Sequence, residues 1–529
     1  MIDALERRVI IEDLSVGFEP DGPLSGFGLG RDFILPPEEP GDARQPAMLY
    51  VAALDAILER VGRTLADVGR AMSEIAVVNF SVQQHGHVLL GERAPILLES
   101  LAVADYPPGL RLQDALQGLF SVPFARIWRT TCTRVEAARL RRGAGGKKAA
   151  IRLTGSNVPS RFTAPCLMKT AAAFPSAYAF TSRIQLLNTL LSSIMTGSAD
   201  TELDYGNACG TSLMDYRARM WSRLLIAAAA EGLPGGASAL RSKLPALASA
   251  LSVQGRVCQF VSSRYGLAGS CAVLCGSGDN CQTKVMADGA LLSLGSSFVF
   301  MAGSDGGIAD ESGAVSAMYD GLDRPFVIAC RTNGALRWDG VREMHGISRR
   351  DYAASDEALR RTPCGNAGRI FSWQAEAETL PPSPAAGPCR IGYDTPCFQT
   401  DYAGIVESSL AATWLHSGHL MKGVQTLFAT GGAASSREVL RRVAAIWNRR
   451  VIPVGEAGAA LGAAVAGGMV SRRLWRIDFP GDHSFASGLA LLGAPVDPVP
   501  EDVEAYHGEN GFLERFAELC PRAKRRMRP

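Results

Sequence analysis

Several features that mark specialised classes of protein are missing from the sequence. Its 54 basic and 52 acidic residues give a formal net charge of only +2, so bulk charge does not indicate binding to nucleic acid or to a membrane. The twelve cysteines include no CxxC pair, which argues against a zinc site of common spacing. The N-terminus has no apolar export segment, and the small apolar run 457–470 is shorter than the about 20 residues of a membrane span. We expect a cytoplasmic protein with reduced, mostly buried cysteines.

Two familiar phosphate-binding motifs are missing as well. The stretch "GAGGKKAA" (143–150) lacks the spacing and the hydroxyl residue of a P-loop. The stretch "GFGLG" (26–30) has no preceding strand and no acidic residue at the distance that a dinucleotide-binding fingerprint requires. A nucleotide site in this chain therefore needs another kind of turn.

What is present is an alternation of helical and strand-like segments. Residues 47–61 have helical periodicity, with Asp55 on the polar face, and residues 437–447 repeat the pattern. This mixture favours an α/β protein of packed layers. Short apolar or alternating runs predict strands at 75–86, 256–262, 271–275, 290–301 and 325–330.

The length of the chain predicts more than one domain. At 529 residues it exceeds what a single core normally holds. We place a boundary near residue 250, because the segments after it are rich in strands. Prolines in 363–400 indicate an exposed insertion. The C-terminal "RAKRRMRP" (522–529) is strongly basic, and we interpret it as a solvated tail, with an electrostatic arm as the alternative.

Three glycine-rich turns follow predicted strands in the second half of the chain. They are "GSGDN" (276–280), "SLGSS" (293–297) and "ATGGAASSRE" (429–438). Glycine lets the backbone approach a phosphate closely, and the last turn runs directly into a helix whose free N–H groups favour anions. Each turn alone is more often structural, but three in one half indicate a nucleotide site.

Two polar segments stand out in the first half. The strand "SVQQHG" (81–86) ends in two amides and His85, and "SNVPSRFTAP" (156–165) presents Arg161 between turn residues. Such side chains suit hydrogen bonds to a polyhydroxylated ligand. The alternatives are a satisfied histidine at a strand end and an exposed loop arginine.

These motifs, together with "TNGALR" (332–337) and "AALGAA" (459–464), occur in an order that resembles the FGGY family of carbohydrate kinases, nearest to its eukaryotic-type xylulokinase branch. The resemblance runs from the start to about residue 470. It implies an α/β fold of two actin-like, ribonuclease-H-like ATPase domains with a cleft between them. It also implies transfer of phosphate from ATP, with Mg²⁺, to a ketopentose, D-xylulose above all, giving D-xylulose 5-phosphate.

The resemblance also implies roles for single residues on the sugar side. Asp279 matches the family's catalytic base, and Asn280 its neighbouring sugar ligand. His85 and Arg161 match the residues that hold the hydroxyls of the ketose. On this basis residues 1–250 are expected to form the sugar-binding domain.

On the nucleotide side the resemblance points to two turns. Gly295 and Ser296 match the second phosphate-binding turn, where the family has a threonine at the position of Ser296. Gly431, Gly432 and Ser436 match the adenosine-binding turn, where Ser436 replaces a common amide. Residues 251–475 are expected to form the nucleotide-binding domain, and 476–529 a C-terminal extension with a helix.

The chain departs from the family pattern at two places. Its first residues resemble the strands that follow the family's N-terminal phosphate-binding turn, so this turn is expected to be missing. "EDLSV" (12–16) imitates it, but Val16 replaces the hydroxyl residue. In "RIWRTT" (126–131), Arg129 stands where relatives often have an acid, which leaves the sugar open.

Two other functions remain as alternatives. One is a catalytically impaired relative that binds sugar or nucleotide as a sensor, as the missing turn would allow. The other is an ATPase of the chaperone or filament kind, against which the paired "SVQQHG" and "GSGDN" argue, because such an ATPase needs no sugar-facing residues.

Overall fold

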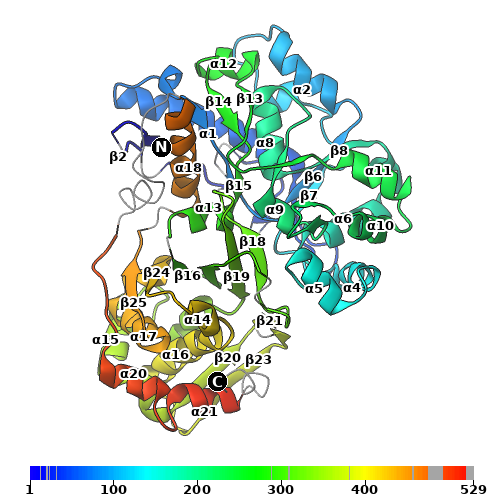
Figure 1. Cartoon of the computed structure of the whole chain (residues 1–529). Coiled ribbons are helices and arrows are strands. Elements are labelled where there is room, and N and C mark those ends of the chain that lie inside the picture. The colour runs from blue at the N-terminus through cyan, green and yellow to red at the C-terminus, as the bar shows by residue number, and fades with distance from the viewer. Residues whose placement is uncertain are drawn as a thin grey trace. The chain divides into compact units, whose positions relative to one another are not determined.

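The structure is a computed structural model that describes residues 1–474 and 492–519, apart from 7, 12–13, 19–21, 23, 31–32, 288, 308–309, 381 and 456–457. Backbone contacts divide the chain into two compact units. Both units mix helices and strands, which confirms the predicted α/β class (Figure 1). The first unit contains Met1–Met286, Ala317–Pro325 and residues 459–474; the second contains Ala287–Ser316, Phe326–Gly458 and residues 492–519.

The boundary predicted near residue 250 lies inside the first unit. Here β13 (Val253–Arg256) pairs with β14 (Ala272–Leu274), and β14 lies parallel to β4 (Val77–Val78). These ladder hydrogen bonds attach the segment after residue 250 to the unit that precedes it. Of the predicted extension, residues 492–519 contain α20 (Pro500–His507) and α21 (Phe512–Glu518), and the basic tail lies outside the described residues.

The N-terminal segment forms a small hairpin. β1 (Ile2–Asp3) pairs antiparallel with β2 (Arg8–Val9). The stretch "EDLSV" begins with two residues outside the described part of the chain, so its likeness to a phosphate-binding turn has no structural test.

Helix α1 (Ala47–Asp67) confirms the helix predicted over 47–61 and continues it to Asp67. Its apolar face is buried in the core of the first unit, as expected. Asp55, however, is buried and not on a solvated face. Its carboxylate accepts hydrogen bonds from the backbone N–H of Leu112 (3.0 Å) and the hydroxyl of Tyr265 (2.7 Å). Long-range donors that periodicity cannot reveal make this burial possible.

One predicted strand is wrong. Residues 256–262 do not form a strand, because β13 ends at Arg256 and helix α12 (Gln259–Tyr265) follows. The helix buries Phe260, Val261 and Tyr265, and aromatic and β-branched residues of this kind suit a buried helix as well as a strand. The strands predicted within 75–86, 271–275 and 325–330 are confirmed in shorter or similar form.

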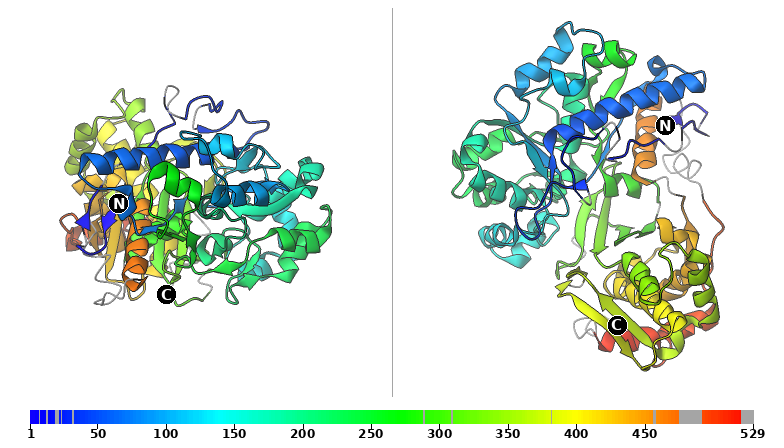
Figure 2. Two further views of the ribbon diagram at one scale, coloured as in Figure 1. Left: turned by 90° about the horizontal axis from the view of Figure 1, so that it is seen from above. Right: turned by 180° about the vertical axis from the view of Figure 1, so that it is seen from behind.

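The last helix of the first unit comes from far along the chain. α18 (Gly458–Leu474) approaches α13 (Asp279–Val285) so closely that a Cβ on Gly462 would lie 1.9 Å from the backbone oxygen of Gln282. Asn79 donates a hydrogen bond from Nδ2 to the backbone oxygen of Ala463 (2.8 Å). Figure 2 shows α18 in orange among the blue and green elements of this unit.

The second unit contains a mixed sheet with neighbouring strands in the order β19-β17-β16-β24-β25. β16 forms an antiparallel hairpin with β17 and runs parallel to β24. The strand predicted over 290–301 is therefore two strands joined by a turn. The bounds are β16 (Ala290–Leu294), β17 (Phe298–Gly303), β19 (Pro325–Arg331), β24 (Thr426–Thr430) and β25 (Arg450–Pro453).

Helices cover this sheet. α17 (Arg437–Trp447) has the bounds that its periodicity predicted, and α16 (Phe398–Ser417) is buried along almost its whole length. The predicted insertion at 363–400 is exposed in β23 (Ala386–Ile391), but β20 (Ile370–Gln374), its partner, packs on α16. In the described part of the chain, no helix combines the length and apolar character needed to cross a membrane.

Candidate active site

Two parallel strands bring the polar segments of the first unit together. β5 (Ser81–Val82) pairs in parallel with β15 (Ser277–Gly278), so the segments that follow both strands leave the same edge. The glycines of "GSG" allow this close pairing. A Cβ on Gly276 would lie 2.7 Å from the backbone oxygen of Phe80, and a Cβ on Gly278 would lie 2.4 Å from Cγ of Gln84. Larger residues do not fit.

Asp279 and Asn280, the first residues of α13, form one hydrogen-bonded group with Gln84. The Oδ1 atom of Asp279 accepts from the backbone N–H (2.8 Å) and the Nδ2 (3.0 Å) of Asn280. The same Nδ2 donates to Oε1 of Gln84 (3.0 Å). Burial raises the pKa of Asp279 to about 6, more than these hydrogen bonds lower it. The carboxylate is thus ionised at neutral pH yet more basic than an exposed aspartate.

His85 is held as a neutral imidazole. Its backbone has a left-handed φ of 70°, and its ring stacks on Phe162 with centroids 4.2 Å apart. Burial, followed by the positive charge of Arg161, lowers the pKa of His85 to about 3. Nδ1 lies 3.1 Å from the backbone oxygen of Gly210, and since a carbonyl only accepts, Nδ1 carries the proton. Nε2 therefore has a lone pair that can accept a hydrogen bond.

Arg161 lies close enough to His85 for its charge to influence that ring. It stands in the loop between α5 (Lys147–Thr154) and α6 (Thr163–Ala173) and is partly buried. Among the described residues it has no hydrogen-bond or ion-pair partner. The guanidinium thus has donors that no described side chain occupies. The four residues predicted on the sugar side all belong to the first unit.

A fifth polar residue was missed by the sequence interpretation. Asp204 is fully buried at the end of β9 (Leu203–Asp204) and accepts a hydrogen bond from Ser277 of β15. Burial raises the pKa of Asp204 to about 6. The only signal in the sequence is an acid followed by small residues in "DYGNACG" (204–210), which is common in ordinary helix caps.

In the second unit two glycine turns leave the same edge of the sheet. Parallel β16 and β24 pair as far as Ser293 and Thr430, and the turn of Gly295 and Ser296 follows β16 while that of Gly431 and Gly432 follows β24. Gly431 has a φ of 90°, and a Cβ there would lie 2.9 Å from the carbonyl carbon of Leu294. A Cβ on Gly432 would meet nothing within 4 Å. The backbone at Gly432 is therefore open to approach by another group.

The side chain of Ser436 is already used within the unit. It caps α17, with Oγ accepting from the backbone N–H of Val439 at 3.2 Å. The same Oγ donates to Oδ1 of Asp356 at 2.5 Å. The position thus starts the helix that follows the glycine turn, and any contact of Ser436 with a nucleotide stays a prediction.

A third turn packs against the first of these two. The backbone N–H of Gly334 donates to the oxygen of Ser296 (3.2 Å), and that of Ala335 donates to the oxygen of Gly295 (3.0 Å). A Cβ on Gly334 would lie 2.8 Å from the oxygen of Ser296. The motif "TNGALR" therefore supports the predicted phosphate turn through its backbone.

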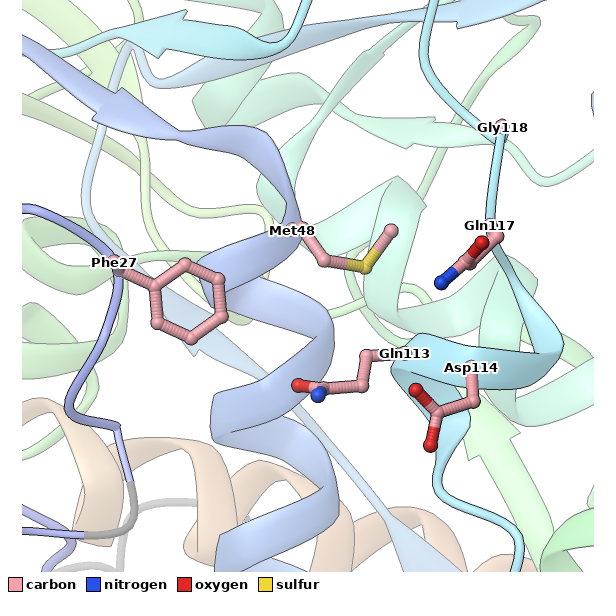
Figure 3. Close-up of a pocket in the computed structure, with 6 residues that line it drawn as sticks. All are labelled: Phe27, Met48, Gln113, Asp114, Gln117 and Gly118. Carbon is pink, nitrogen blue, oxygen red and sulfur yellow. The ribbon is translucent and has the colours of Figure 1, made fainter.

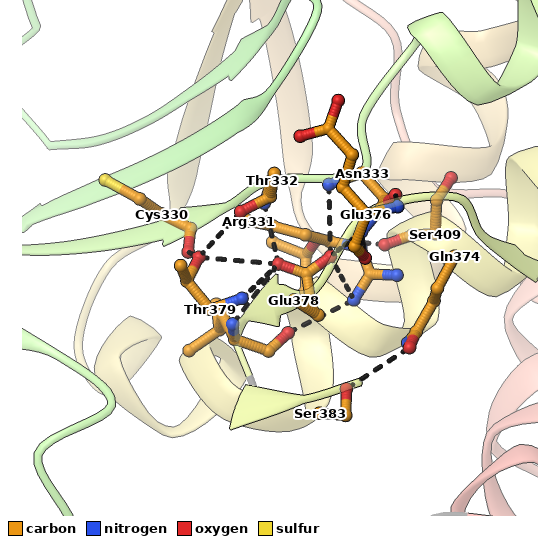
Figure 4. Close-up of polar contacts among 12 residues, drawn as sticks. Cys330, Arg331, Thr332, Asn333, Gln374, Glu376, Glu378, Thr379, Ser383 and Ser409 are labelled. Carbon is orange, nitrogen blue, oxygen red and sulfur yellow. Dashed lines mark hydrogen bonds and ion pairs between the residues drawn. The ribbon is translucent and has the colours of Figure 1, made fainter. Parts of the chain in front are cut away.

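One buried carboxylate holds this third turn, as Figure 4 shows. Glu378 accepts hydrogen bonds from the backbone N–H groups of Thr332 (2.6 Å) and Asn333 (3.0 Å), and from Nδ2 of Asn333 (2.9 Å). Nη1 of Arg331 lies 3.6 Å from Oε2 of Glu378. Burial alone would raise the pKa of Glu378, but the charge of Arg331 and these hydrogen bonds lower it. The turn is thus fixed by an ionised side chain.

No protein-only metal cage is seen in the described ranges, where no three His, Cys, Asp or Glu side chains gather closely enough to hold an ion. A surface pocket of about 280 Å³ lies in the first unit (Figure 3). It contains none of the predicted site residues, and its one acid, Asp114, is bonded to Arg111. The lining residues are Phe27, Met48, Gln113, Asp114, Gln117 and Gly118.

Comparisons with known proteins find relatives over nearly the whole chain. The chain is 26% identical to the xylulose kinase of Rattus norvegicus over 553 aligned residues, which cover 98% of this chain and 92% of that protein. Its structure is similar to that of the xylulose kinase from Rhodospirillum rubrum, with a TM-score of 0.75, 17% identity and coverage of 93% and 92% of the two chains. A gluconate kinase from Lactobacillus acidophilus gives a TM-score of 0.74 at 15% identity, with coverage of 92% and 90%.

No model of a known protein family matches the sequence, so the assignment depends on these relatives and on the fold. The sequence match and the structural match each cover nearly the whole chain, and they confirm the resemblance inferred from the ordered motifs. The chain is a homologue of the xylulose kinases and has the two-domain α/β fold of the FGGY-type carbohydrate kinases.

Proposed function

We propose that this protein is an ATP-dependent kinase that phosphorylates the terminal hydroxyl of a ketopentose, D-xylulose first among them. One observation carries the proposal: Asp279 and His85 follow two paired parallel strands, β15 and β5, in the first unit. Asp279 has a carboxylate with a raised pKa, and His85 has a neutral imidazole. The homologues named xylulose kinase support the choice of sugar.

Asp279 acts as the general base in this proposal. A carboxylate with a pKa of about 6 is ionised at pH 7 but still accepts a proton readily. Phosphoryl transfer has a loose transition state in which the acceptor hydroxyl loses its proton late, so orienting that hydroxyl matters as much as basicity. Asn280 contributes by holding Oδ1 of Asp279 with two hydrogen bonds, which fixes the orientation of the carboxylate.

His85 and Arg161 recognise other hydroxyls of the sugar. The neutral imidazole accepts a hydrogen bond from a sugar hydroxyl at Nε2, because Nδ1 donates to the backbone oxygen of Gly210. The guanidinium of Arg161 supplies donors for hydroxyl or carbonyl oxygens. Together an acceptor and a donor distinguish the orientation of a ketose more strictly than either alone.

The second unit would hold ATP. Its glycine turns fit a polyphosphate, because Gly432 is open and the backbone around Gly295 and Ser296 is fixed by Gly334. A magnesium ion bound with the phosphates would neutralise charge that develops during transfer. Since the described residues hold no three-ligand cluster, such an ion would take most of its ligands from phosphate and water.

A coupled assay of ADP release tests the proposal. The purified chain is incubated with ATP and Mg²⁺ and with a panel of ketopentoses, ketohexoses, polyols and gluconate. We expect ADP release with D-xylulose and much less with sugars that differ at the carbons facing His85 and Arg161. ADP release with none of the panel, together with sugar or nucleotide binding in calorimetry, would contradict the kinase proposal and favour a sensor.

A further inference from the structure

Asp204 is a buried acid without a cation beside it among the described residues. Its side chain is fully buried, and no described Lys, Arg or His forms an ion pair with it. Hydrogen bonds satisfy it instead. Oδ1 accepts from Nδ2 of Asn188 (3.0 Å) and Nδ2 of Asn207 (2.9 Å), while Oδ2 accepts from the backbone N–H of Asn207 (2.9 Å) and from the hydroxyl of Ser277. A buried carboxylate with four donors is a built feature of the fold.

The first connection leads from Asp204 to the proposed base. Ser277 lies in β15, two residues before Asp279, and its side chain is directed at Oδ2 of Asp204. Asn188, which donates to Asp204, also donates to the backbone oxygen of Cys275 at 3.1 Å. Two hydrogen bonds thus fix the chain immediately before the turn from which Asp279 projects.

The second connection leads to the imidazole. Asp204 is the N-cap of α9 (Tyr205–Cys209), where it accepts from the backbone N–H of Asn207. This helix is a little longer than one turn, so it is not stable alone and depends on its cap for its position. The next residue, Gly210, provides the oxygen that binds Nδ1 of His85. A Cβ on Gly210 would lie 2.6 Å from that nitrogen, so a small shift of α9 displaces the ring.

We infer that Asp204 is a positioning residue that holds both the general base Asp279 and the sugar-binding His85, through Ser277 and through α9. This inference rests on the proposed function for its catalytic consequence, but the hydrogen bonds themselves do not. An amide would not replace the carboxylate, because its N–H₂ group would face the backbone N–H of Asn207 or the side-chain donors of Asn188 and Asn207.

Three variants test the inference. Asp204→Asn removes an acceptor from both connections, while Ser277→Ala removes only the connection to Asp279. Asp55→Asn is the control, since Asp55 is another buried acid of the first unit that is not part of the proposed site; it has backbone and hydroxyl donors and, unlike Asp204, also pairs with Arg264. Steady-state kinetics with D-xylulose and hydrogen exchange of the unliganded chain are measured for all three.

We expect Ser277→Ala to lower kcat about tenfold, with KM for the sugar within twofold of wild type, since small displacements of a reacting group cost up to about a hundredfold. Asp204→Asn should lower kcat further and raise KM for the sugar about fivefold. Asp55→Asn should leave both within twofold. Hydrogen exchange should increase at 205–212 and 276–285 in Asp204→Asn, and only at 276–285 in Ser277→Ala.

Unchanged exchange in both segments of Asp204→Asn would overturn the inference, and so would increased exchange with unchanged kcat and KM. If Asp204→Asn does not fold, Ser277→Ala decides in the same way for the connection to Asp279. A wild-type chain that phosphorylates none of the sugars would refute the proposed function. The exchange data would then still show whether Asp204 holds the two segments, because they are recorded without turnover.

Discussion

The two sets of predicted site residues use different physical means. In the first unit the proposed functional atoms belong to side chains, and burial changes their chemistry: the pKa of Asp279 is raised to about 6 and that of His85 is lowered to about 3. In the second unit the proposed functional groups are backbone turns, and glycine geometry places them. If the proposed function holds, the chemistry should be sensitive to single side chains in the first unit. Nucleotide binding in the second unit should be sensitive to the shape of the backbone.

The largest expected effect tests the proposed side-chain site of the first unit. Asp279→Asn should lower kcat about 10²–10⁴-fold, which is what a general base contributes, while KM for ATP changes little. The variant should also unfold at a higher temperature at pH 7. Because the pKa of Asp279 is raised from 3.8 to about 6, its contribution to stability is fully present below pH 3.8 and is lost as pH rises through about 6. At pH 7 the buried charge therefore destabilises the folded chain, and the neutral amide of the Asp279→Asn variant removes this destabilisation. Activity within tenfold of wild type would exclude Asp279 as the base.

The next effect concerns Glu378, which supports the backbone turns of the second unit. Glu378→Gln should destabilise the second unit by about 3 kcal/mol, because Arg331 loses its buried counterion and the turn at Thr332 loses a charged acceptor. KM for ATP should rise more than KM for the sugar. Thermal unfolding and two-substrate kinetics measure these changes. An equal rise of both KM values would show that Glu378 does not act through the phosphate turn.

A matched pair of glycines gives a smaller effect. Gly431→Ala should destabilise the chain by about 1–2 kcal/mol, because a left-handed residue with a side chain is strained and its Cβ would contact Leu294 at 2.9 Å. Gly432→Ala should cost less than about 1 kcal/mol, since nothing lies within 4 Å of its Cβ. Urea unfolding compares the two variants. Equal losses of unfolding free energy would mean that the backbone of the turn is not constrained as described.

The pH dependence gives the smallest effect. If Asp279 is the proposed general base, it must be ionised for catalysis, so kcat/KM should fall about tenfold for each pH unit below its pKa of about 6. His85 should not contribute to the profile, because it remains neutral down to about pH 3. Initial rates between pH 4.5 and 8 in buffers of constant ionic strength measure the curve. A second inflection that disappears in His85→Asn would contradict the neutral imidazole.

The sequence predicts the local elements of this structure better than its long-range contacts. Periodicity places α17 with its observed bounds, because an amphipathic helix on a sheet is determined by its own residues. The mistaken strand at 256–262 and the buried Asp55 show the limit. There the outcome depends on partners distant in the sequence, such as Tyr265 for Asp55.

The same limit applies to the site. His85 and Asp279 are singled out by polar residues and glycines that follow predicted strands, and their proposed roles come from the family resemblance. Asp204 and Glu378 are not, because a buried acid gives no signal until its donors are known, and those donors lie up to 73 residues away for Ser277 and 46 for Thr332. Residues that hold the others in place are the part of the site that single-sequence reasoning misses.

Helix α18 has a consequence for how the protein is made. Residues 459–474 complete the first unit by packing on α13 and near β4, yet they are synthesised after nearly the whole second unit. A ribosome adding about 5–20 residues per second needs about 10–40 s to pass from Met286 to Leu474. During that interval the surface of the nascent first unit that α18 later covers stays uncovered, so this unit is completed only when almost the whole second unit has been made.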